Sequence, residues 1–206
     1  MSTSARYTEA ALPNTSRALG VNLLPMTMGH AVLLQRIGSP FAPFVPFDDS
    51  VEIGFGDVAE AIYVLSRPWD VAEGQLRGRI YRVRMFWWAL RFLIAVKLQP
   101  WKALSVPTAS AAIARHVREC CTGPGVFPTR TDGRSAEAPY LAILEVTLRR
   151  RLHVQNPMEC EIRRALWLTS VDAELEGAVE FRSDRIPDQL PPMNPETGKP
   201  AMASAS

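Results

Sequence analysis

The longest apolar stretch of the chain lies within residues 70–99. Apolar positions recur there at the three- and four-residue spacing of an amphipathic helix. The arc that we expect to be buried consists of Ile80, Val83, Trp87, Leu90 and Ile94, widened by Phe86, Leu93 and Leu98. Arg77, Arg84 and Arg91 are spaced by seven and mark a second, charged face. Trp88 is expected on that charged face, four residues after Arg84.

The same periodicity predicts shorter helices on both sides of this stretch. Thr27 is suited to be an N-cap and Gly38 to follow the last turn, which brackets one helix. Asp57 is expected to cap a second helix that stops before Pro68. A further helix is predicted to begin at Ser105 or Thr108, either of which can cap it, and to end near residue 121. Two more are predicted in residues 139–151 and 157–176.

One sizeable core suffices for a chain of 206 residues. We therefore predict an all-α fold, a single-domain bundle of about five to six helices around a central helix near residues 70–99. The flanks lack an apolar period, so we expect a flexible N-terminal arm over 1–20 and a Pro-rich disordered tail over 183–206. The helical domain is then 21–182, and residues 178–182 can extend as a short strand.

The apolar run at 85–98 does not predict a transmembrane helix. It has Arg91 in its middle and is shorter than the roughly 17 to 25 residues that a membrane span needs. Basic residues and tryptophan still suit a membrane surface. The first 20 residues lack the apolar core of a secretory signal, and three cysteines are no disulfide framework. We expect a cytoplasmic protein.

The charge balance disfavours nucleic acid as a partner. Lys and Arg number 23 against 21 acidic residues, a net charge of +2, so binding to a polyanion would require a local basic patch. Arg149, Arg150 and Arg151 end a predicted helix, where the macrodipole favours cations. The alternative is a contact with phosphate or with an acidic partner.

No pattern of catalytic residues is present. The histidines His30, His116 and His153 have no spaced acid or nucleophile beside them, and the serine-hydrolase and zinc-protease motifs are missing. His30 is expected to be half-buried and hydrogen-bonded to backbone. His116 and Cys120 have metal-ligand spacing, but two ligands do not make a site. We therefore predict no enzyme, no metal, no cofactor and no small-molecule substrate.

Aromatic residues suggest a surface for protein partners instead. Trp88 and Trp167 are each expected on a polar helix face, four residues after an arginine. They can stack on that arginine or anchor another protein. The phenylalanines of the Pro-rich loop at 39–56 can cover the core or contact a partner. The candidate partner-binding residues are Arg84, Trp88, Arg91, Arg163, Trp167, Phe41, Phe44 and Phe47.

A resemblance covers roughly residues 21–70, with a weaker one in 140–182. It rests on the pattern Leu24-x-Met26-Thr27-x-Gly29-His30-x-x-Leu33-Leu34-x-Arg36-Ile37-Gly38-Ser39-Pro40-Phe41, followed by Leu65-Ser66-Arg67-Pro68-Trp69. This pattern resembles small helical proteins encoded among the tail genes of tailed phages and prophages, some of which are described as tail assembly chaperones. The resemblance implies a protein that holds aggregation-prone tail components, notably the tape-measure protein, before assembly. It carries over no site residues.

The predicted function is therefore a non-enzymatic phage or prophage tail assembly factor in the host cytoplasm. Two alternatives remain open. One is a structural tail component that stays in the virion, and the other is a protein that binds nucleic acid or a membrane surface through its arginines.

Overall fold

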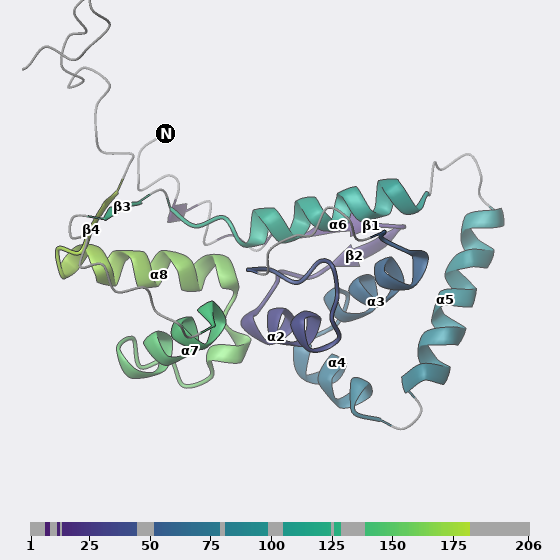
Figure 1. Ribbon diagram of the computed structural model, residues 1–206, viewed down its shortest axis with the longest axis horizontal. Coiled ribbons are helices and arrows are strands. Elements are labelled where there is room, and N and C mark those ends of the chain that lie inside the picture. Colours follow the sequence, from purple (N-terminus) through teal and green to yellow (C-terminus); the bar gives the residue numbers. More distant parts are fainter. Residues whose placement is uncertain are drawn as a thin grey trace, which may run out of the picture.

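The computed structural model of the chain describes residues 7–8, 12, 14–44, 52–78, 81–98, 105–124, 126–128 and 139–181, with only the backbone at some positions, among them 84 and 91 (Figure 1). The described residues form seven α-helices: α2 (Met28–Arg36), α3 (Phe55–Leu65), α4 (Trp69–Leu76), α5 (Tyr81–Leu98), α6 (Val106–Cys120), α7 (Tyr140–Arg150) and α8 (Ile162–Leu175). A 3₁₀ turn, η2 (Pro157–Glu159), precedes α8. The predicted helical character is confirmed.

Two small antiparallel sheets accompany the helices, and most of their strands were not predicted. β1 (Ser16–Ala18) pairs with β2 (Val21–Leu23), and β3 (Val126–Pro128) pairs with β4 (Val179–Phe181). β4 confirms the strand expected at 178–182.

The expected N-terminal arm over 1–20 is wrong at its end, because residues 16–20 belong to the first hairpin. Leu19 and Gly20 both have positive φ, which is the geometry of a two-residue turn whose twist matches the strands it joins. Ala18, at the end of β1, is buried in the core. The hairpin is thereby part of the folded domain.

The two ends of α2 follow the predicted capping residues. Thr27 is the N-cap of α2, and Gly38 follows its C-cap with a positive φ, as expected. The cap of α3 was predicted one turn too late. Gly54 is the N-cap, while Asp57 lies at the third helical position and accepts a hydrogen bond from the Gly54 N–H at 2.8 Å. Asp57 therefore stabilises the helix start from inside the helix.

The extended residues 24–27, which we call the linking segment, join parts of the chain that are far apart in sequence. The Leu24 N–H donates to the Leu65 carbonyl at the end of α3, at 2.8 Å. The Ile162 N–H at the start of α8 donates to the Met26 carbonyl at 3.0 Å. These bonds place α2, α3 and α8 around one core.

The predicted central helix near residues 70–99 is wrong in two respects. The stretch forms two helices, α4 and α5, because the chain leaves the helix at Arg77 and Gly78. Glycine is the least favourable residue for a helix apart from proline. α5 also lies at the edge of the molecule, at the right of Figure 1, beside α3. The element at the centre is α3, which has seven buried residues.

We predict that Gly29→Ala destabilises the protein. A Cβ at Gly29 in α2 would lie 2.4 Å from an indole carbon of Trp69, so the ring would have to move. Overpacking of this kind typically costs about 1 to 3 kcal/mol of unfolding free energy, which urea denaturation measures. The matched control is Gly74→Ala in α4, where the new Cβ meets no atom within 4 Å. The control should be neutral or slightly stabilising, and equal losses in both variants would contradict this packing.

Candidate functional site

α5 is held against α3 by a stack of three side chains. The Trp88 ring lies edge-on to the Tyr63 ring, with 5.5 Å between ring centroids. The Arg67 guanidinium lies 3.7 Å from the Tyr63 centroid and 5.9 Å from that of Trp88. A cation placed over aromatic faces is attracted by their quadrupoles. This stack decides which side of α5 faces the protein.

A hydrogen bond fixes the beginning of α5 in the same orientation. The Tyr81 hydroxyl donates to Glu60 Oε1 of α3 at 3.0 Å. Burial, together with the nearby Glu60 carboxylate, raises the pKa of Tyr81, so the phenol stays protonated and remains a donor. Met85 is buried one turn further along the same side.

The opposite side of α5 exposes five apolar side chains, which we call the α5 stripe. It consists of Val83, Phe86, Trp87, Leu93 and Ile94, which are 41 to 64% exposed. Phe86 and Trp87 contact each other edge to face, with 6.3 Å between ring centroids. The five side chains expose on the order of 500 Å². On a typical monomer the largest apolar patch has an area of about 300 to 600 Å², so the α5 stripe lies near the upper end of that range.

The sequence-based orientation of this helix is therefore wrong. Val83, Trp87 and Ile94 were expected in the buried arc and are exposed. Trp88 was expected on the charged outer face, yet it packs against the core. The side chains of Arg84 and Arg91, two candidate partner-binding residues, lie outside the described part of the structure.

Trp167 is also placed differently from the expectation. Its side chain is only 5% exposed and stacks on Phe181 of β4, with 5.7 Å between ring centroids. Tyr7 contacts it edge-on at 5.8 Å. The expected exposed anchor is thus a core residue. The neighbouring Arg163 is half-buried, and its Nε has no hydrogen-bond partner among the described residues.

The phenylalanines of the Pro-rich loop divide between core and surface. Phe41 is 5% exposed and belongs to the main core, as the covering alternative predicted. Phe44 is 40% exposed and lies 4.8 Å, between ring centroids, from Tyr140 of α7. Phe47 lies outside the described residues. Among the three, only Phe44 is shown to be accessible to a partner.

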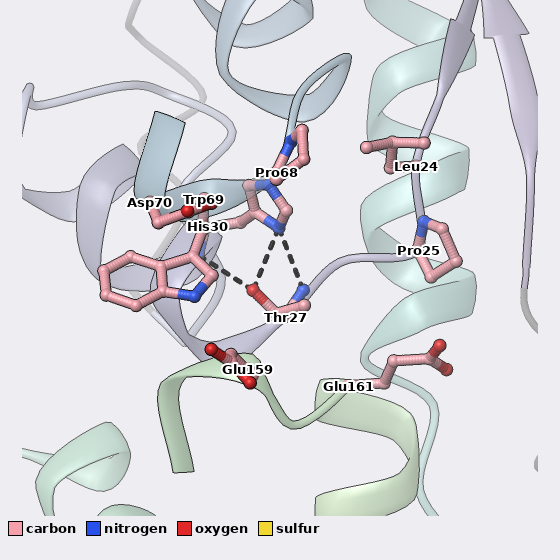
Figure 2. Close-up of a pocket in the computed structure, with 9 residues that line it drawn as sticks. All are labelled: Leu24, Pro25, Thr27, His30, Pro68, Trp69, Asp70, Glu159 and Glu161. Atoms are coloured by element: carbon pink, nitrogen blue, oxygen red, sulfur yellow. Dashed lines mark hydrogen bonds between the residues drawn. The ribbon is translucent and has the colours of Figure 1, made fainter. Parts of the chain in front are cut away.

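A cleft of about 390 Å³ opens where α2 begins (Figure 2). His30 lies in it beside Trp69 and Asp70 of α4, with Glu159 and Glu161 opposite. Three of its lining residues are acidic, so the cleft is acidic.

The ring of His30 joins α2 to the start of α4. Its Nδ1 accepts from the Thr27 N–H at 3.1 Å, which completes a capping box. Its Nε2 lies 2.7 Å from the Arg67 carbonyl, and since a carbonyl can only accept, Nε2 carries the proton. The expected hydrogen bonding of His30 to backbone is confirmed, but the side chain is fully buried rather than half-buried.

A second buried histidine bonds to the linking segment. His116 of α6 donates from Nε2 to the Leu24 carbonyl at 3.0 Å. The Cys120 Sγ lies 3.7 Å from the same nitrogen. Burial raises the pKa of the Cys120 thiol, which disfavours the thiolate that a metal would bind. Among the described residues no three His, Cys, Asp or Glu side chains converge as a metal site would require.

Comparison of the chain with protein-family models, with curated proteins and with solved structures finds no match. Within the described ranges, no helix combines the length and the apolar character needed to cross a bilayer.

Trp87 was expected to be buried and is exposed, whereas Trp167 was expected to be exposed and is buried. We predict that replacing each of them by alanine changes the unfolding free energy by a different amount. Trp167→Ala should lower the unfolding free energy by about 3 to 5 kcal/mol, because it empties a buried site. Trp87→Ala should change it by less than about 0.5 kcal/mol, because the ring is 64% exposed. Urea denaturation followed by circular dichroism compares the two. A larger loss for Trp87→Ala would show that the α5 stripe is covered in the folded protein.

We also predict that stability falls as the solution becomes mildly acidic. Burial lowers the pKa of His30 and of His116 below the ordinary 6.5. Below pH 6.5 the unfolded chain therefore binds more protons than the folded chain. The stability that the two neutral histidines contribute is complete above this pH and is lost as the pH falls towards their lowered pKa values. Each histidine can change the unfolding free energy by at most about 1.4 kcal/mol per pH unit.

Unfolding free energies between pH 7.5 and 5.5 measure this effect. His116→Gln keeps a donor for the Leu24 carbonyl but removes one titrating group, so its slope should be shallower. An identical slope in both proteins would rule out His116 as a contributor.

Proposed function

We propose that this protein is a non-enzymatic, chaperone-like assembly factor that binds another protein through the α5 stripe. The observation that carries the proposal is the exposure of Phe86 and Trp87 on a helix whose other side packs on α3. Exposed aromatic rings anchor protein interfaces, and an apolar patch of this size commonly marks a contact site. Helices α2–α4 and α6–α8 then act as the bundle that presents α5.

We infer the identity of the partner from the resemblance of residues 21–70 to small phage tail proteins. It points to a tail component, with the tape-measure protein as the first candidate. Long helical proteins expose apolar faces until they assemble, and a helix such as α5 can cover such a face in the host cytoplasm.

We predict that the α5 stripe is required for capture of the tape-measure protein encoded in the same genome. Co-expression of the two proteins should keep the tape-measure protein soluble and bound in a pull-down. The double variant Phe86→Ser/Trp87→Ser should reduce the captured amount at least ten-fold, because it removes the two aromatic side chains that are most exposed among the described residues.

The matched control is Leu175→Ser at the end of α8, which is 83% exposed and lies outside the α5 stripe. It should bind as the unchanged protein does, and circular dichroism should show all three proteins folded. Equal capture by the double variant would contradict the proposal. Detection of the chain in mature particles by mass spectrometry would favour a structural tail component instead.

A further inference from the structure

All charged residues of α5 are basic. Its 18 residues include Arg82, Arg84, Arg91 and Lys97 and contain no acidic residue. The helix therefore contributes four positive charges to a chain whose net charge is only +2. A binding element whose charges are all of one sign selects partners of the opposite sign and rejects partners of the same sign.

The α5 stripe has the dimensions of a contact with a single helix. Its members follow spacings of three and four from Val83 to Ile94, with the half-buried Leu90 between them. At 1.5 Å per residue this is about 16 Å, or three helical turns. An amphipathic helix that docks in this way presents anchors at i, i+3, i+4 and i+7.

We infer that the segment bound by α5 is an acidic amphipathic helix of the partner protein. This inference rests on the proposed function and adds the chemistry of the occupant to it. Apolar side chains of the segment would cover Phe86 and Trp87, while its carboxylates would face the basic positions of α5. Desolvation of the rings supplies affinity, and the charges supply selectivity.

A second copy of this chain fits less well. Two α5 helices in contact would bring eight positive charges together without one carboxylate from either helix. A partner with acidic flanks neutralises this charge instead.

The inference is tested with three synthetic 18-residue helical peptides and the full-length protein. The peptides share one apolar stripe and carry glutamate, glutamine or lysine at the remaining positions. Fluorescence anisotropy should show the glutamate peptide binding at least ten-fold more tightly than the glutamine peptide, and the lysine peptide binding most weakly. Raising the salt concentration should reduce the difference.

Two variants separate the contributions. Trp87→Ser should weaken binding of the glutamate peptide at least ten-fold, whereas Leu175→Ser should not. Arg84→Gln/Arg91→Gln halves the charge of α5 and should reduce the preference for glutamate over glutamine several-fold. Equal binding of the glutamate and glutamine peptides would overturn the inference.

Two other occupants give distinct results that would also overturn it. Trp87-dependent self-association in analytical ultracentrifugation would identify a second copy. Trp87-dependent binding to vesicles with 30% anionic lipid, with no binding of the glutamate peptide, would identify a membrane surface. If the tape-measure protein is captured but the glutamate peptide does not bind, the proposed function stands and only the chemistry of the segment is wrong.

Discussion

The arrangement of the helices depends on the extended segment that precedes α2. A strand-like segment without a sheet has backbone groups that must be satisfied by other parts of the chain. Leu24 bonds through its N–H to Leu65 and through its carbonyl to His116, while Met26 accepts from Ile162. One short segment thereby joins the end of α3, the middle of α6 and the start of α8. Loss of any of these bonds would leave a buried polar group unpaired.

The attachment of α5 is of a different kind. It docks on α3 through side chains, with the Trp88 and Tyr63 rings around Arg67 and with the Tyr81 hydroxyl on Glu60. Such contacts favour one rotation of the helix about its axis, because a turn of half a revolution would break all of them. The exposed rings on the far side are therefore a consequence of how the near side is satisfied.

These two kinds of attachment explain what could be predicted from the sequence. Caps are local, so Thr27 and Gly38 were enough to place α2. The rotation of α5 was not predictable from its own residues, because apolar positions occur on both of its sides and only α3 decides between them. The burial of Trp167 depends on Phe181, which lies in a strand beyond the end of α8. The position of Trp167 on a helical wheel gives no sign of that contact.

The exposure of the α5 stripe has a physical cost that bears on function. Turning the α5 stripe inward would bury Phe86 and Trp87, yet it would expose Trp88 and leave Glu60 without the Tyr81 hydroxyl. Separating this partly buried hydrogen-bonded pair costs free energy, and the cation–π stack would be lost as well. The orientation observed is thus stable for the isolated chain while leaving two aromatic rings in water. Coverage of those rings by another molecule recovers the remaining hydrophobic free energy, at roughly 25 cal/mol for each Å² removed from water, without disturbing the contacts that hold the helix.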